Sequence, residues 1–539
     1  MLLSVLGFIS ILGPLVVVHE FGHYFFARIF GVKAEVFSVG FGPKIWSRQR
    51  GETEWCLSVI PLGGYVKLLG EEPGQELPPE LAHRSLQRQT RWKRFFIFFG
   101  GPLFNFIFAA ILFMAIQVIG EEHITSKIGR VLPGSVAAVS GLRAGDKVIA
   151  IDGKAVSKFE DIEHALTDRP GHSVELKVER PGAANALSFT VKAEKESGYS
   201  QYGEKIEVGS IPGIFPAARD LTIGVSNPES PAARAGAKTG DRVQTWNGKA
   251  VADFEQLEML YESAKPGEVI SLGILSDKSP ISVSFTKPAD GQSLAAVSGL
   301  HSSELFIEKV LGGSPAEKAG LQKGDRLVAV DSQAIRSFFE LREKVQKAGE
   351  VAGKAVLSWE RNGQLFQKEA IPSEKTVKDA ELVKSREFTV GIYPMLSWAS
   401  PEYLIERTLN PLVVFYQGVE KMVSLSWRNL VSLGKMVVGD VSMKTLGGPI
   451  LIGKIAGESL ARGLITFLGT MAILSIGLGV LNILPVPVLD GGHILLLGVE
   501  AIRGKPLKMR QLEIVQQVGL ALILILMAVV MKNDFLRVF

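Results

Sequence analysis

The stretch VVVHEFGHYFF, residues 16–26, places two histidines and a glutamate inside an otherwise apolar run. The chain before them carries no charged residue, and the apolar character resumes directly after them. A charge at the centre of a bilayer costs roughly 3 kcal/mol on insertion scales. The three polar residues, His19, Glu20 and His23, therefore need a specific chemical reason to be there.

The composition of the 539-residue chain indicates an integral membrane protein with large parts outside the bilayer. Hydrophobic residues make up 47% of the chain, and the mean hydropathy is +0.23. The net charge of +4 gives no indication of nucleic-acid binding, so we expect no nucleic-acid partner. The single cysteine, Cys56, excludes a disulfide framework and a cysteine-rich zinc site.

Four apolar stretches are long enough to span a bilayer. The first is not a signal peptide, because it lacks a basic region before the apolar run and a small-residue cleavage site after it. We predict transmembrane helices at 1–30, 95–119, 464–500 and 513–532, the third of which contains an LDG motif.

The loops next to these spans predict their orientation. The loop at 31–94 ends in a basic cluster, and the loop before the last span is also basic. Because short basic loops stay in the cytoplasm, the long stretch between the second and third spans and both termini should lie on the other side. The basic residues are Arg91, Lys93 and Arg94 in the first loop and Arg503, Lys505, Lys508 and Arg510 in the second.

Two segments of the 31–94 region have the pattern of strands broken by glycine and proline. They are AEVFSVGFGPKIW at 34–46 and TEWCLSVIPLGGYVKL at 53–68. They could form an ordinary cytoplasmic hairpin or a part of the machinery that handles substrate.

A pattern repeats three times in the long stretch, with Gly-Asp pairs at 145/146, 240/241 and 324/325. Each copy predicts a short alanine-rich helix ended by a glycine, a Gly-Asp turn, an apolar strand and a second helix. The copies resemble PDZ domains of bacterial envelope proteases, and we assign them to 126–215, 220–290 and 304–375. PDZ domains bind extended chain ends by strand addition; a peptide-binding role and a role as steric screen both stay open.

The composition changes after the third copy. Residues 385–460 alternate apolar and charged residues at roughly helical spacing, which predicts amphipathic helices on the outer membrane surface or against the repeats. Ordinary helices packed on a soluble domain fit the pattern equally well.

The opening motif, His19-Glu20-Phe21-Gly22-His23, has the spacing HExxH. On a helix, residues four apart share a face, so both imidazoles can hold one zinc ion. Zinc lowers the pKa of a water ligand to about 7. Glu20 stands beside the histidines, where it can take a proton from that water.

Catalytic zinc usually takes three protein ligands. The third span ends in NILPVPVLDGGH, residues 482–493, where Asp490 follows an uncharged run. We predict that Asp490 is the third ligand, and His493 is the alternative. Pro485 and Pro487 should break the helix so that this segment can bend towards the first span.

Together, HEFGH, GPLFN at 101–105, NILPVPVLDGG and the PDZ-like repeats resemble the site-two protease family, of the regulator of sigma-E protease type. The resemblance implies a polytopic α-helical membrane protein with four spans, a membrane-reentrant β-loop at 31–94 and tandem α/β PDZ domains. It implies an intramembrane zinc metalloprotease of the bacterial inner membrane, with its active site near the cytoplasmic side and its PDZ domains and termini in the periplasm. Implied substrates are single-span proteins already trimmed outside, such as an anti-sigma factor, and remnant signal peptides.

The resemblance also carries residue roles. His19, His23 and Asp490 match the zinc ligands, Glu20 the catalytic glutamate, and Asn482 an asparagine near the substrate strand. Asn105 matches the polar residue of the GxxxN segment; its amide could bind substrate or oxyanion, or join two helices. The chain departs from well-studied bacterial members, which carry two PDZ domains, and Gly477 stands where some members have a second asparagine. The alternative from another class is an inactive, membrane-anchored PDZ scaffold.

Overall fold

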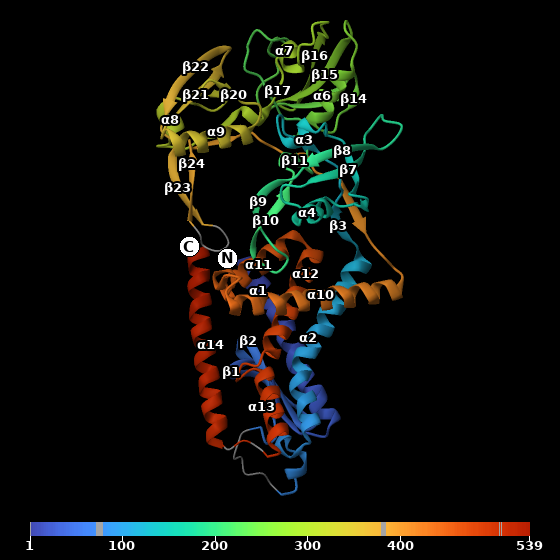
Figure 1. The fold of residues 1–539 in the computed structure, drawn as a ribbon, viewed down its shortest axis with the longest axis vertical. Coiled ribbons are helices and arrows are strands. Elements are labelled where there is room, and N and C mark those ends of the chain that lie inside the picture. Colours follow the sequence, from blue (N-terminus) through green and yellow to red (C-terminus); the bar gives the residue numbers. More distant parts are fainter. Residues whose placement is uncertain (1, 72–78, 379–383, 506, 508, 539) are drawn as a thin grey trace.

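The computed structural model describes residues 2–71, 79–378, 384–505, 507 and 509–538. A bundle of long helices forms one end of the molecule, and three small α/β units form the other (Figure 1). The first helix begins and the last helix ends at the end of the bundle nearest the units, as the charge pattern predicts (Figure 1). Of the basic loop residues, Lys508 lies outside the described residues.

Four helices in the described part of the chain are long and apolar enough to cross a membrane. Their core contains buried Ile11 and Leu15 packed against Phe113 and Ile476. The last helix packs loosely on the others: only 6% of its most apolar 18-residue stretch is buried. The four are α1 (Leu2–Ile29), α2 (Arg91–Ile119), α12 (Leu464–Ile483) and α14 (Met509–Val538).

The predicted third span at 464–500 is two helices rather than one. Helix α12 ends at Ile483, and α13 (Asp490–Arg503) begins seven residues later. Pro485 and Pro487 lie in the gap, where they interrupt helical hydrogen bonding as expected. The chain continues in the same direction along α2 after the break, since Ser475 of α12 contacts Asn105 and Glu500 of α13 contacts Arg94. The break places Asp490 at the start of a new helix.

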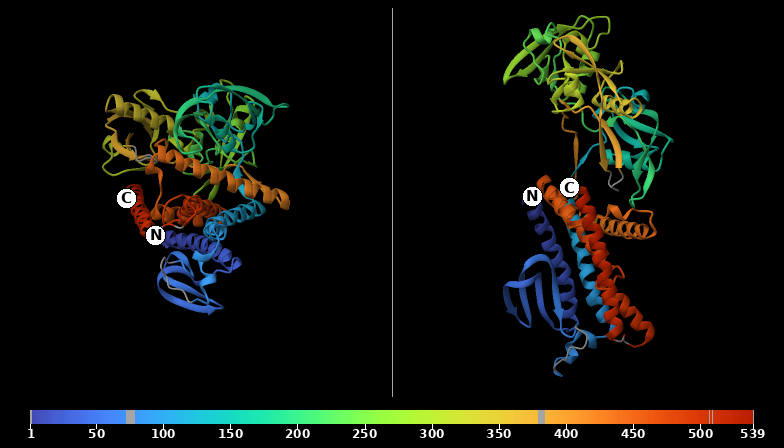
Figure 2. Two further views of the ribbon diagram at one scale, coloured as in Figure 1. Left: turned by 60° about the horizontal axis from the view of Figure 1, so that its bottom comes forward. Right: turned by 90° about the vertical axis from the view of Figure 1, so that its left-hand side faces the viewer.

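The predicted strands of the 31–94 region form a curled sheet beside α1 (Figure 2). Strand β1 (Ala34–Arg50) pairs with β2 (Thr53–Leu68) in antiparallel register. Residues 36–39 pair with 54–57 on one side and with 64–67 on the other. Residues 64–67 therefore form one edge of the sheet, and 44–50 form the opposite edge.

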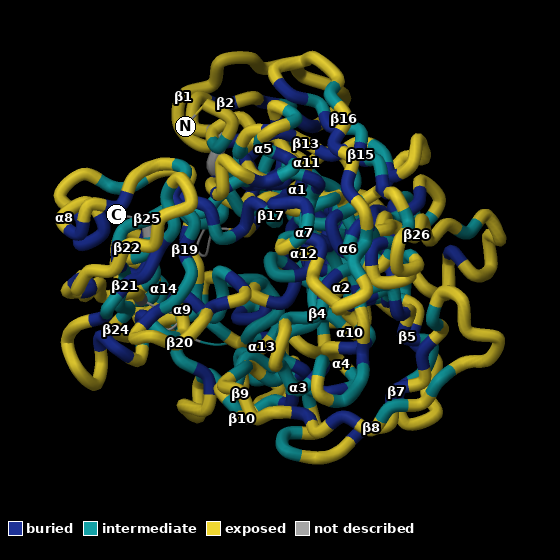
Figure 3. Tube along the Cα trace, turned by 90° about the horizontal axis from the view of Figure 1, so that it is seen from above, coloured by how far each residue is buried: buried dark blue, intermediate teal, exposed yellow. Residues whose placement is uncertain are grey.

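Each repeat folds around its own apolar core and a four-stranded antiparallel sheet. Figure 3 shows buried stretches inside the units and exposed loops around the rim of the molecule. The strand order is the same three times: β6-β5-β7-β8, β14-β13-β15-β16 and β20-β19-β21-β22. The strands are β5 (Lys147–Ile151), β6 (Lys154–Ala155), β7 (Ser173–Glu179), β8 (Leu187–Lys192), β13 (Arg242–Trp246), β14 (Lys249–Ala250), β15 (Val269–Ser276), β16 (Ser279–Thr286), β19 (Arg326–Val330), β20 (Gln333–Ala334), β21 (Ala355–Arg361) and β22 (Gln364–Ala370).

The repeated motif has a structural explanation that is the same in all three units. The alanine-rich helices are α3 (Val136–Val139), α5 (Pro231–Arg234) and α8 (Pro315–Ala319). Each is followed by a glycine at a φ near +90°, where a side chain would be strained. The aspartate of each Gly-Asp pair then accepts a hydrogen bond from the backbone N–H three residues before it. The longer helices are α4 (Phe159–Thr167), α6 (Phe254–Ser263) and α9 (Phe338–Val351).

The units connect to the bundle through a two-stranded stalk and one further contact. Strand β3 (Glu121–Ile124), directly after α2, pairs with β26 (Tyr403–Glu406). The tip of the hairpin formed by β9 (Glu194–Tyr199) and β10 (Lys205–Ser210) reaches helix α10 (Pro411–Val438). Helix α10 lies across the bundle (Figure 1).

The prediction of helices throughout 385–460 is wrong for its first part. Residues before Pro411 form strands β24 (Lys384–Thr389), β25 (Ile392–Pro394) and β26 instead. Prolines at 394, 401 and 411 oppose a helix there, and β26 gains a partner from the distant β3. Helices α10 and α11 (Pro449–Arg462) follow, and both pack on the bundle.

Candidate active site

The HExxH motif lies in the last third of α1, so the site is nearer to the end of the bundle that faces away from the units. His19 is ten residues before the end of α1, about 15 Å along the axis. Both imidazoles project from one face of the helix, and their side chains are 11% and 12% exposed. The histidines thus lie inside protein rather than against lipid.

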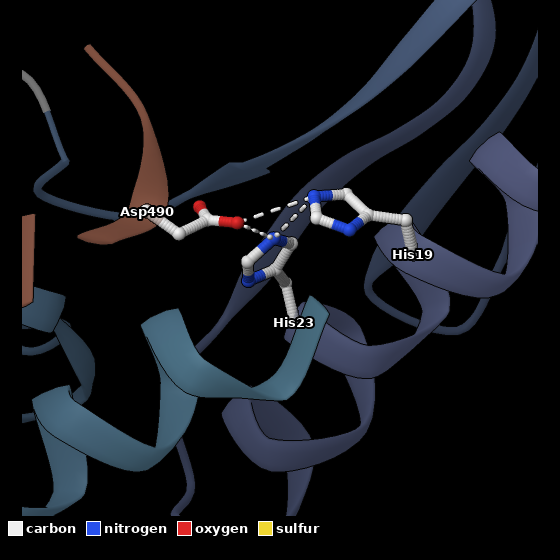
Figure 4. Close-up of side chains that lie close together, drawn as sticks. All are labelled: His19, His23 and Asp490. Atoms are coloured by element: carbon white, nitrogen blue, oxygen red, sulfur yellow. Dashed lines mark hydrogen bonds and ion pairs between the residues drawn. The ribbon is translucent and has the colours of Figure 1, made fainter. Parts of the chain in front are cut away.

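The two imidazoles and Asp490 point toward one another (Figure 4). Nε2 of His19 lies 3.3 Å from Nε2 of His23, and Oδ2 of Asp490 lies 3.2 Å and 3.5 Å from these two nitrogens. Among the described residues, these three form the group of metal-type donors that lie within 4.8 Å of one another. His493 is not part of that group.

The donor triangle fits a tetrahedral zinc site. Zinc binds histidine nitrogen and carboxylate oxygen at about 2.0–2.2 Å. Two ligands of a tetrahedron are then about 3.3–3.6 Å apart, and all three edges of the triangle lie within about 0.1 Å of that range. The donor chemistry of two neutral imidazoles and one carboxylate also suits a catalytic site that keeps a position open for water.

Glycines bring α1 and α2 close enough for this arrangement. A β-carbon on Gly22 would overlap the backbone of Gly100, and a β-carbon on Gly100 would overlap the backbone of Gly22. Gly101, one residue further on, faces the imidazoles directly: a β-carbon there would lie 2.7 Å from Cε1 of His19. Small residues at such crossings are typical of membrane helices.

The segment between α12 and α13 aims Asp490 at the histidines. Gly491 and Gly492 pack so tightly against the carbonyls of Ile483 and Val486 that neither position has room for a β-carbon. Val488 has a φ of +82°, which is strained for a β-branched residue. Such strain is often found where a functional side chain must be placed precisely.

The second ring nitrogen of each histidine also has a neighbour. Nδ1 of His23 lies 2.8 Å from the carbonyl oxygen of Ile97, which accepts its N–H. Nδ1 of His19 lies 3.1 Å from the amide of Asn105. Outer contacts of this kind fix the tautomer and the ring orientation of metal ligands.

A cavity of about 450 Å³ opens on the donor triangle. Glu20, Asn482 and His493 line it, together with residues of the sheet edge at 64–67. Nδ2 of Asn482 lies 3.5 Å from Nε2 of His19, and the ring of His493 stacks on Phe98 with 4.6 Å between centroids. Asn105 is fully buried and does not line this cavity.

Several residues of the site could not be recognised from the sequence alone. Gly101 and the carbonyl of Ile97 matter only because α2 crosses α1 at this point. Tyr65 and Glu71 also line the cavity, from the end of β2 and the turn after it. The GPLFN stretch at 101–105 was the available signal for α2, since it pairs small residues with a buried amide in an apolar span.

Comparison with known proteins places the chain in a family. Its residues 7–526 match the model of peptidase family M50. It is 30% identical to the regulator of sigma-E protease RseP of Escherichia coli and to the regulator of sigma E protease of Haemophilus influenzae, with 98% of each chain covered in both cases. It is also 30% identical to the protease RseP of Yersinia pestis, over 99% of this chain and 98% of the relative. The chain belongs to peptidase family M50.

Proposed function

We propose that the protein is an intramembrane zinc metalloendopeptidase that cleaves the transmembrane segments of single-span proteins. The observation that carries this proposal is the donor triangle of His19, His23 and Asp490 on membrane-spanning and adjoining helices, with Glu20 in the same cavity. A protein with no metal chemistry has no reason to bury these groups at membrane depth.

The residues divide the chemistry between them. His19, His23 and Asp490 would hold a zinc ion, which would supply Lewis acidity towards the scissile carbonyl and the attacking water. Glu20 accepts the proton of the attacking water and later delivers it to the leaving amine. Asn482 lines the cavity beside His19, where its amide can hold the substrate backbone.

The edge of the sheet at 64–67 supports a role in substrate binding. A transmembrane helix hides its peptide bonds, so cleavage requires an extended segment. In the described part of the chain, residues 64–66 pair with β1 on one side and with no strand on the other, and Gly64 lies directly against Glu20: a β-carbon there would be 3.2 Å from its Cγ. An unwound substrate can add to this edge as a further strand and recover backbone hydrogen bonds.

Proline substitutions test the strand-addition step, because proline removes a backbone N–H. Tyr65→Pro and Val66→Pro should reduce cleavage while zinc content stays at one ion per chain. Ile45→Pro, on the opposite edge of the same sheet, is the matched control and should leave cleavage near the wild-type rate. Equal cleavage by all variants would reject strand addition at this edge.

The three outside units are proposed to be PDZ domains that exclude substrates with bulky external domains. Their number, their shared strand order and their position above the bundle support this role. Two relatives are named for regulating sigma E, so an anti-sigma factor trimmed outside is the proposed substrate class, with remnant signal peptides as a second. The proposed location is the bacterial inner membrane, with the units in the periplasm.

The decisive experiment is cleavage of a single-span reporter without its external domain, in reconstituted membranes, with zinc content measured in parallel. Glu20→Gln should lose at least about 100-fold in rate and keep zinc. Asp490→Asn should lose both zinc and cleavage, whereas His493→Ala should keep zinc. Cleavage by Glu20→Gln at the wild-type rate would reject the proposal and favour an inactive membrane-anchored scaffold.

A further inference from the structure

Asn105 lies next to the metal-binding histidines, and the proposed cleavage reaction gives it no role. It lies on α2, one helical turn after Gly101, and none of its surface is exposed. Its Nδ2 lies 3.1 Å from Nδ1 of His19, and its Oδ1 is buried without a hydrogen-bond partner. Because Asn105 lies behind His19 rather than in the cavity, it cannot touch a substrate there.

The chemistry of a metal-binding histidine decides what Asn105 must do. An imidazole that binds metal through Nε2 is neutral and carries its proton on Nδ1. The group next to Nδ1 must therefore accept a hydrogen bond. The nitrogen and oxygen of an amide exchange places by a half turn about χ2, and the hydrogen-bond network decides between the two orientations. Oδ1 facing Nδ1–H satisfies both groups.

We propose that Asn105 is a positioning residue for the zinc ligand His19: its Oδ1 accepts the Nδ1–H of His19 and holds the ring with Nε2 toward Asp490 and His23. His23 has a backbone carbonyl, that of Ile97, in the equivalent place. The two ligands are thus held by the same kind of contact, one from the backbone and one from a side chain of α2. This inference rests on the proposed zinc site.

A second contact of Asn105 separates this role from helix packing. Oγ of Ser475, on α12, donates to the backbone carbonyl of Asn105 at 2.8 Å. That bond joins α2 to α12 and does not involve the amide. Replacing the Asn105 side chain removes the partner of His19 and leaves the inter-helix bond available, whereas Ser475→Ala does the reverse.

The test measures the zinc dissociation constant of the purified full-length protein by chelator competition. Asn105→Leu, similar in size but without an acceptor, should bind zinc about 10–100-fold more weakly than wild type. Asn105→Asp keeps an acceptor and should bind at least as tightly as wild type. Ser475→Ala should stay within about threefold, and thermal unfolding with chelator present checks that each variant is folded.

The outcomes separate this inference from the proposed function. If wild type binds one zinc ion and His19→Ala abolishes binding, the zinc site stands whatever Asn105 does. Wild-type affinity in Asn105→Leu, or an equal loss in Ser475→Ala, would overturn the positioning role and leave helix joining as the function of this residue. If wild type binds no zinc, the zinc-peptidase proposal itself fails.

Discussion

Gly101 on α2 faces His23 on α1 so closely that a β-carbon at position 101 would overlap the imidazole Nε2. Gly101→Ala should therefore displace the His23 ring and weaken zinc binding by at least about tenfold. Gly13→Ala is the matched control, because a β-carbon there meets nothing within 4 Å. The measurement is zinc affinity of both variants; equal affinities would show that α2 can move away without cost.

Part of the site follows from sequence and part does not. The spacing of His19 and His23 predicts a shared helical face, and the uncharged run before Asp490 predicts its depth. Asn105, Gly101 and the carbonyl of Ile97 depend on how α2 crosses α1, which local patterns do not encode. Local patterns also do not predict β26. Its apolar residues have a helical spacing, but nearby prolines oppose a helix and the segment pairs with a strand about 280 residues away.

The three α/β units at the end of the molecule away from the bundle share a buried ionic contact around Arg130. Its guanidinium, 3% exposed, donates to Glu304 at 2.6 Å and faces Glu255 at 3.8 Å. Glu304 also accepts from the backbone N–H of Phe338 in the third unit. Arg130 of the first unit thus contacts an acidic group of the second unit and one at the start of the third.

Arg130→Met should destabilise the three α/β units by about 3–5 kcal/mol, because it leaves the buried carboxylate of Glu304 without its arginine partner, whereas Glu255 keeps Arg219 at 2.6 Å. Lys238→Met is the control: that lysine pairs with Asp277 at 2.8 Å, but both side chains are more than half exposed. Such a pair contributes about 0–1 kcal/mol. Pulse proteolysis in urea measures both changes, and similar losses in the two variants would contradict a special role for Arg130.

The hairpin tip of the first unit rests on α10, which packs on the bundle that carries the site. Glu204 pairs with Lys435 at 2.5 Å, and Arg428 donates to the carbonyl of Gln201 at 3.2 Å. If this contact fixes the unit above the bundle, Lys435→Glu should speed cleavage of a reporter that keeps its external domain (untrimmed) relative to one that lacks it (trimmed). Like charges then face each other across the contact.

The charge-swapped double variant Glu204→Lys/Lys435→Glu should restore the discrimination between the two reporters. Arg234→Glu, in an exposed pair with Glu229 on the second unit, should leave it unchanged. A ratio of rates that is the same in Lys435→Glu and wild type would show that the hairpin contact plays no part in screening.

His301 on β17 (His301–Ser302) makes the outside part sensitive to acid. Burial, reinforced by the nearby Arg326, lowers its pKa from 6.5 to about 4, and Glu360 opposes this only in part. The unfolded chain therefore binds a proton between pH 6.5 and 4 that the folded chain does not. Stability is full above this window and falls as the pH drops through it, by up to about 3 kcal/mol.

Replacing His301 with glutamine removes this titration, so His301→Gln should lose less stability than wild type between pH 7 and pH 5. His164, an exposed histidine of α4, provides the control, and His164→Gln should follow the wild-type curve. Pulse proteolysis in urea at both pH values gives the free energy of unfolding. An acid loss in His301→Gln as large as in wild type would assign the sensitivity to carboxylates instead, because their protonation is the other common source of acid unfolding.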